Sequence, residues 1–247
     1  MIAQIVAGVG ISIYTLWMHP VRTVGSAMSE ECDGKRSRKS ALVEIVRLST
    51  AACLQQSVMN FGILMIQGLV NSFGPTVMAA FAAAVKIDSF AYMPAQEFGN
   101  AFSLFISQNF GAGKKERLRK GMKTAAGISM GFCAAVSILI WVTAPKLMQI
   151  FVKGNERAVI ATGVGYLQLE GAFYCGIGLL FLLYGYYRGI KKPEMSLVLT
   201  IISLGTRVLL AYLLAPVSNI GVLGIWWAIP IGWVLADAVG IWYMRKR

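Results

Sequence analysis

The stretch SQNFGAGKKERLRKG (Ser107–Gly121) decides the fold class of this chain. It begins at the end of the mostly apolar run 76–110 and changes within a few residues to glycine and positive charge. The cations are Lys114, Lys115, Arg117, Arg119, Lys120 and Lys123. Such a boundary is typical of three features: a phosphate-binding loop, a nucleic-acid patch, or the cytosolic end of a membrane helix.

The composition of the chain separates these three. A phosphate-binding loop needs a glycine five residues before the Gly113-Lys114 pair, and Gln108 stands there instead. Of the 247 residues, 57% are hydrophobic and 14% charged, against about 25% charged in average soluble domains. A net charge of +12 would suit a nucleic-acid binder, but such a binder has no use for so much apolar surface. We therefore expect a membrane protein whose basic residues face anionic lipid, with no nucleic-acid partner.

Seven apolar segments are long enough to cross a hydrocarbon core, which takes about 20 helical residues. They are 2–18, 45–72, 76–110, 122–143, 159–187, 194–214 and 222–244. The predicted fold class is all-α, a multi-pass membrane helix bundle with about seven transmembrane helices. Because Pro94 lies inside the long segment 76–110, we expect a kink there or a distal part that lies along the interface.

The basic residues alternate between the two sides of this predicted bundle. Connections 19–44, 111–123 and 188–193 and the tail 245–247 hold 17 of the 23 basic residues, and the alternate connections hold three. Lysine and arginine collect on the cytosolic side of membrane proteins. We predict a bacterial plasma-membrane protein with an outside N-terminus and a cytosolic C-terminus, in which the cluster after Gly113 is a cytosolic loop.

Residue types that carry catalysis or bind metals form no motif here. Cys32, Cys53, Cys133 and Cys175 show no paired spacing, and His19 is the only histidine. Neither a metal site nor a Ser-His-Asp or Cys-His arrangement can be assembled. We expect no enzymatic activity, no metal and no organic cofactor.

Charged residues inside the predicted spans are costly in a bilayer and call for an explanation. They are Lys86, Asp88, Glu97, Glu170, Arg207 and Asp237. On a straight helix, Lys86 and Glu97 share a face, whereas Asp88 points elsewhere, toward Tyr92. We favour a functional role for Lys86, Asp88 and Glu97, because three charges on one proline-bearing helix are expensive. Structural roles are favoured for Arg207, as a partner of broken backbone, and for Asp237, as a snorkelling carboxylate.

Glu170 belongs to a second stripe at three- and four-residue spacing. Its members are Tyr166, Glu170, Tyr174, Ile177 and Phe181. A carboxylate flanked by tyrosines suits a cationic aromatic guest, and a carboxyl at such a depth also suits proton exchange. The alternative is that the tyrosines are interfacial or packing residues, which is the commoner role of tyrosine in membrane helices.

Three stretches together resemble the multidrug and toxic compound extrusion (MATE) family of transporters. They begin at LVNSFGPTVMAAFAAAVKIDSFAYMPAQEFGN, YLQLEGAFYCGIGLLFLLYGYYRGIKKPEMS and GVLGIWWAIPIGWVLADAVG. The resemblance implies a six-helix second lobe over residues 42–247. Residues 1–18 resemble the last helix of the first lobe, and 19–41 the cytosolic linker between lobes. Met59 stands where many sodium-coupled members have a glutamate.

This resemblance implies an antiporter, or half of one, that exports organic cations, drugs or metabolites in exchange for H⁺ or Na⁺. Asp88, Glu97 and Glu170 would exchange cations or protons, Lys86 would tune their charge state, and Tyr92 and Tyr174 would contact substrate. The expected partners are membrane lipid, a small cationic substrate, and a missing first lobe or a second copy of the chain. Two alternatives stay open: a lipid-linked sugar flippase of the same superfamily, and a non-transporting fragment or scaffold that needs a partner lobe.

Overall fold

The computed structural model describes residues 38–217 and 220–246, and six helical residues near the start of the chain. These six are Val6, Val9, Gly10, Ile13, Tyr14 and Trp17. The chain divides into two compact units, Met1–Arg47 and Leu48–Arg247. Most of the predicted first span and of the linker 19–41 lies outside the described residues. The functional residues of interest all lie in the second unit.

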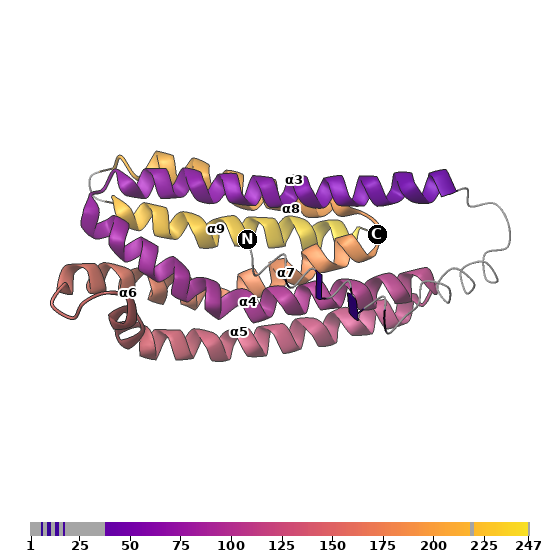
Figure 1. The fold of residues 1–247 in the computed structure, drawn as a ribbon, viewed down its shortest axis with the longest axis horizontal. Coiled ribbons are helices and arrows are strands. Elements are labelled where there is room, and N and C mark those ends of the chain that lie inside the picture. The colour runs from indigo at the N-terminus through magenta and orange to yellow at the C-terminus, as the bar shows by residue number, and fades with distance from the viewer. Residues whose placement is uncertain are drawn as a thin grey trace. The chain divides into compact units, whose positions relative to one another are not determined.

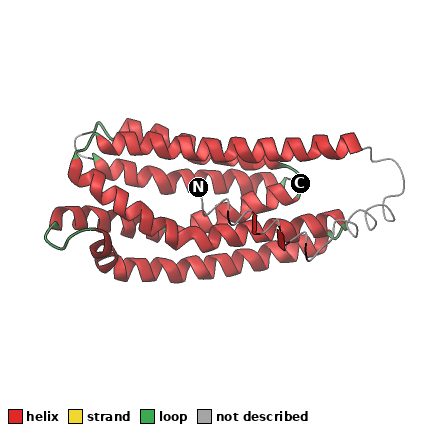
Figure 2. Ribbon diagram, in the orientation of Figure 1, coloured by secondary structure: helices red, strands yellow, loops and turns green. Residues whose placement is uncertain are grey.

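The described residues form helices joined by short turns, which confirms the predicted all-α fold class (Figure 2). Five helices are long and apolar enough to cross a membrane. They are α3 (Arg38–Asn71), α4 (Pro75–Gly111), α5 (Lys115–Phe151), α8 (Pro193–Leu214) and α9 (Val222–Arg245). A sixth crossing results if α6 (Arg157–Ala172) and α7 (Tyr174–Gly189) count together as one span.

The predicted span 159–187 contains a bend of 55° between α6 and α7 that the sequence did not predict. The break lies at Phe173, where no proline is present. Two hydrogen bonds between residues three apart, as in a 3₁₀ turn, connect the helices at the break. They run from Phe173 N to Glu170 O at 2.9 Å and from Gly176 N to Phe173 O at 2.8 Å. The bend puts Glu170 at the end of one helix and Tyr174 at the start of the next.

The helix α4 ends at Gly111, one residue beyond the predicted span 76–110, but the cationic cluster after it is not a loop. Gly113 has a φ of 68°, which favours glycine because it has no Cβ. The helix α5 begins only two residues later, at Lys115, and carries most of the cluster on its first turns. Glu116 offsets part of this charge through an exposed ion pair of 2.7 Å with Lys120. The expected connection 111–123 therefore shrinks to a turn.

Small residues bring α4 and α7 into backbone contact, and this contact positions the site. A Cβ on Gly99 would lie 2.7 Å from the carbonyl oxygen of Phe181, and one on Gly185 would overlap the carbonyl oxygen of Gly99. Close approach through glycine is a common way of packing membrane helices, because it lets the two backbones meet. The helix α4 continues through Pro94 and changes direction along its length (Figure 1).

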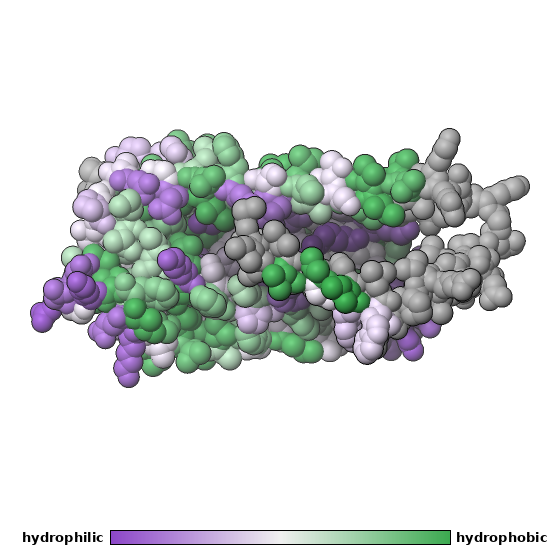
Figure 3. All heavy atoms as spheres, viewed as in Figure 1, coloured by the Kyte–Doolittle hydropathy of each residue, from purple (hydrophilic) through white to green (hydrophobic). Residues whose placement is uncertain are grey.

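Apolar side chains cover both the core and the outside of this unit. The core gathers residues of α4, α6, α7 and α9, such as Phe81, Leu167, Leu182 and Ile229. On α5, Ile138, Leu139, Trp141 and Val142 are all more than half exposed. Apolar side chains are spread over the visible face, and hydrophilic ones gather at the end with the loop before α6 (Figure 3). Together with the helix lengths, this surface indicates a multi-pass membrane protein.

Candidate functional site

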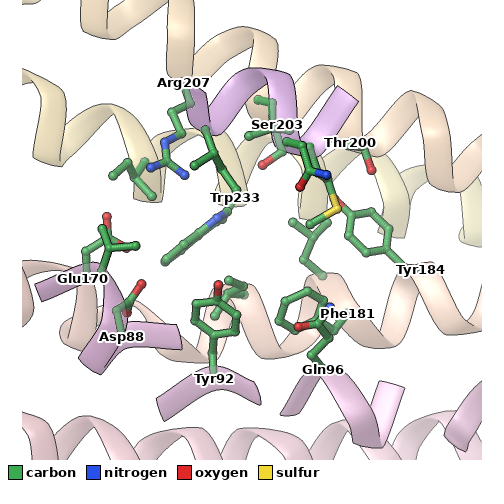
Figure 4. A pocket seen from close by; sticks show the side chains of 18 of the residues that line it. Asp88, Tyr92, Gln96, Glu170, Phe181, Tyr184, Thr200, Ser203, Arg207 and Trp233 are labelled. Atoms are coloured by element: carbon green, nitrogen blue, oxygen red, sulfur yellow. The ribbon is translucent and has the colours of Figure 1, made fainter. Parts of the chain in front are cut away.

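A cavity of about 300 Å³ lies between the helices of this unit. Its wall is built from α3, α4, α6, α7, α8 and α9 (Figure 4). The polar lining residues are Gln56, Asn60, Asp88, Tyr92, Gln96, Tyr166, Glu170, Tyr184, Thr200, Ser203 and Arg207. Between them lie aromatic and aliphatic side chains, including Phe81, Ile177, Phe181, Ile229 and Trp233. An apolar cavity with a few convergent polar groups is the usual form of a small-molecule site.

Asp88 lies on the buried face of α4, where only 6% of its surface is exposed. The hydroxyl of Tyr174 donates a hydrogen bond of 2.6 Å to Asp88 Oδ1. This bond joins α4 to the first residue of α7. Asp88 lines the cavity, whereas Tyr174 contacts the site through Asp88. The sequence expected both residues in the site, and the structure brings them together.

Glu170 is fully buried at the end of α6, and neither of its carboxylate oxygens has a hydrogen-bond partner. Despite the bend, the whole predicted stripe from Tyr166 to Phe181 is buried. Tyr166 packs edge-on against Phe81 and Trp226, with ring centroids 5.5 and 4.9 Å away. A buried carboxyl with two unused acceptors is costly unless a proton or a cation joins it. This position is therefore suited to taking up positive charge.

Aromatic rings line the cavity beside the two carboxyl groups. Tyr92 is half-buried, lies on the same face of α4 as Asp88, and has its ring centroid 5.9 Å from that of Phe181. Trp233 of α9 points into the same space (Figure 4). Faces of aromatic rings attract cations, most strongly when water is excluded. Met59 also lines the cavity, at a place where a glutamate would have added a third carboxylate.

Arg207 was interpreted from the sequence as a structural residue, but the structure places it in the cavity wall. Its guanidinium projects from α8 toward the space shared with Glu170 and Asp88 (Figure 4). Its Nε atom is buried without a hydrogen-bond partner. The signal that could have located it is the spacing of Thr200, Ser203 and Arg207, which repeats every three or four residues and marks a polar stripe on one face of α8.

Lys86 and Glu97 are not among the residues that line the cavity. Both side chains are exposed on α4, on the face opposite to Asp88, as the helical spacing predicted. Glu97 Oε2 accepts a hydrogen bond of 3.3 Å from Asn100, whose Oδ1 accepts one of 2.7 Å from Arg188 of α7. This network braces α4 against α7. Roles of Lys86 and Glu97 in binding stay predictions.

Asp237 was expected to reach the surface, but its side chain is buried in α9 with 7% exposure. Its Oδ1 atom has no hydrogen-bond partner. A Cβ on Gly176 of α7 would lie 3.8 Å from its Oδ2 atom, so the carboxyl faces a helix and does not snorkel. Within the described residues, no group of three or more potential metal ligands occurs.

Comparison with known proteins places the chain among membrane transporters. The MatE family model matches residues 51–213, which is more than half of the chain. Two Bacillus subtilis proteins described as probable multidrug resistance proteins are similar: YpnP is 31% identical over 159 residues and YoeA 24% over 204. These alignments cover 64% and 82% of this chain, but only 35% and 43% of the relatives.

Solved structures have the same fold at low sequence identity. An outward-facing multidrug resistance MATE family transporter aligns with a TM-score of 0.84 and 22% identity over 97% of this chain. The MATE transporter ClbM, in complex with Rb⁺, aligns over 82% with a TM-score of 0.77. The chain covers 53% and 47% of these two proteins, about half of each. On the family match, the helical fold and the membrane spans, this chain belongs to the MATE family of multidrug transporters.

Proposed function

We propose that this chain provides the cation-binding lobe of a secondary antiporter. In this proposal the antiporter exports organic cations, or related drugs and metabolites, in exchange for H⁺ or Na⁺. The observation that carries the proposal is the pair Asp88 and Glu170 in one aromatic cavity, with both oxygens of Glu170 lacking a partner. Substrate and coupling ion would compete for these carboxylates.

The chemistry of the cavity favours a flat cationic guest. The carboxylates of Asp88 and Glu170 supply negative charge, and Tyr92, Phe181 and Trp233 supply ring faces. A volume of about 300 Å³ lies at the lower end of the range for drug-sized ligands, about 300–1,000 Å³. Either a proton or a sodium ion could neutralise the same carboxylates after the substrate has left.

Alternating access would need a second lobe against this one. In transporters built from repeats, the substrate site lies at the interface of the repeats, and these rock against each other around it. The relatives are about twice as long as the matched region or more. We propose that the opposite wall comes from a first lobe or from a second copy of this chain, in the plasma membrane, with the basic first turns of α5 on the cytosolic side.

The test is ethidium efflux from energised vesicles by a two-lobe protein that contains this chain. Glu170→Gln keeps the shape of the side chain but removes its charge and its proton, so efflux should fall more than tenfold or lose its dependence on the ion gradient. Glu156→Gln, at an exposed position before α6, is the matched control and should transport normally. Full, normally coupled efflux by Glu170→Gln would contradict the proposal.

One observation favours a second candidate, a flippase for lipid-linked sugars. Arg207 gives the cavity a cation that could hold a phosphate group. The vesicle assay separates the candidates, because a flippase would move a fluorescent lipid-linked phosphosugar and leave ethidium in place. A scaffold without transport activity would move neither.

A further inference from the structure

We propose that Arg207 is a tethered competitor for the cation site. Its guanidinium would move onto Glu170 and Asp88 when the substrate leaves, and would oppose the substrate while it is bound. The inference rests on the proposed function and explains how that same site releases its cation. Three features carry it: the shared cavity, the missing partners, and the gap between opposite charges.

The three charged groups come from different helices and face one space. Asp88 lies on α4, Glu170 on α6 and Arg207 on α8, and all three line the cavity (Figure 4). Both oxygens of Glu170 and the Nε of Arg207 are buried without hydrogen-bond partners. Among the described residues, no ion pair of 4 Å or less joins Arg207 to either carboxylate. Complementary groups thus line the same cavity without a direct ion pair between them.

A carboxylate and a guanidinium that share a cavity without a direct ion pair are in an unfavourable arrangement. Glu170 and Asp88 are buried and Arg207 is half-buried with a buried Nε atom, and none of the three gains the contact energy of a closed ion pair. A guanidinium matches a carboxylate with two parallel N–H donors, on a long side chain that can reorient. Rotation of Arg207 toward Glu170 would satisfy three buried polar atoms at once. The wall of the cavity therefore carries its own cation, which can pair with the carboxylates in place of a substrate.

A bound cationic substrate has to share this space with Arg207. Two positive charges in a cavity of low dielectric repel each other, so Arg207 lowers the affinity of the site. It also reduces the cost of release, because the carboxylates receive a replacement partner when the substrate leaves. Arg207 would therefore speed dissociation without touching the bound substrate. A residue that only held the fold together would not change the dissociation rate in this direction.

The test measures ethidium binding to the purified full chain in lipid nanodiscs by fluorescence. Arg207→Met should lower the Kd at least about tenfold, which is about 1.4 kcal/mol, mainly through slower dissociation. Arg207→Lys keeps the charge and should stay within a few-fold of the unsubstituted chain. Lys146→Met removes an exposed cation from α5 and controls for net charge, so its Kd should not change.

Two further variants make each outcome decisive. Arg207→Gln is neutral but polar, and it should also bind ethidium more tightly, so poor folding of Arg207→Met alone does not end the test. Weaker or unchanged binding in a folded neutral variant would overturn the inference. Glu170→Gln examines the proposed function separately: if it leaves ethidium binding unchanged, the cation site itself is wrong. If Glu170→Gln weakens ethidium binding and Arg207→Gln does not lower the Kd for ethidium, only the competitor role of Arg207 is refuted.

Discussion

The glycine contact between α4 and α7 offers a sharp test of how the site is positioned. In Gly185→Ala, the new Cβ would overlap the carbonyl oxygen of Gly99 and lie 3.2 Å from its carbonyl carbon and 3.5 Å from the Ser103 nitrogen. All three atoms belong to backbone and cannot rotate away. Carbon–oxygen contacts in proteins are about 3.3 Å or longer, so the two helices have to separate by about 1 Å.

The size of the effect follows from two opposing contributions. Replacing glycine by alanine inside a helix stabilises it by about 0.5–1 kcal/mol. Overpacking costs about 1–3 kcal/mol. Gly165→Ala on α6 is the matched control, because nothing lies within 4 Å of its new Cβ. The free energies of unfolding of the two variants should therefore differ by about 1–3 kcal/mol, with Gly185→Ala the less stable.

The assay is unfolding of the purified chain by SDS in mixed micelles, followed by tryptophan fluorescence. Gly185→Ala should also weaken ethidium binding, because the hydrogen bond from Tyr174 to Asp88 spans the same pair of helices. Equal stability of the two glycine variants would refute the reasoning. It would mean that α4 and α7 do not meet at their backbones.

Two other predictions concern the carboxylate pair and the topology. Tyr174→Phe removes the 2.6 Å hydrogen bond to Asp88. Since buried hydrogen bonds between membrane helices contribute about 0.6–2 kcal/mol, ethidium affinity should fall about three- to thirtyfold; unchanged affinity would show that Asp88 does not depend on this donor. Single cysteines at Lys115 and Lys191 should react with an impermeant reagent only from the cytosol, and one at Asn155 only from outside; labelling of position 115 in intact cells would invalidate the predicted orientation.

Several features of the chain follow directly from its sequence. Long apolar segments predict membrane helices because each backbone polar group in a bilayer has to be satisfied within its own segment. Five of the six spans predicted after residue 45 are confirmed as single helices for that reason, and the sixth, 159–187, is the bent pair α6 and α7. Helical spacing also separated the buried face of Asp88 from the exposed face of Lys86 and Glu97. These outcomes depend on helix geometry and on contact with lipid. Both can be predicted from the sequence of a single segment.

The limits of the sequence appear where two segments meet. Arg207 was assigned to structure and Asp237 to the surface, because a charge inside an apolar run does not reveal whether it faces lipid, a neighbouring helix or a cavity. The bend at Phe173 could not be predicted from a proline, because none is present there. The cationic cluster was expected to be a loop because of its charge. Instead, α5 begins at Lys115, seven residues before the predicted apolar span 122–143, and includes most of the cluster.

The sequence by itself determined the helices, the cationic cluster at Lys114–Lys123 and the presence of carboxylates inside the predicted spans. These features depend on hydropathy and charge along one segment. Only the tertiary structure decided which charges share a cavity. Asp88, Glu170 and Arg207 are far apart in the chain. Backbone contact through Gly99 and Gly185, together with the bend after Glu170, sets how α4 meets α6 and α7, and the cavity brings Arg207 of α8 to the same place. Such contacts depend on shape complementarity between segments, which no single segment encodes.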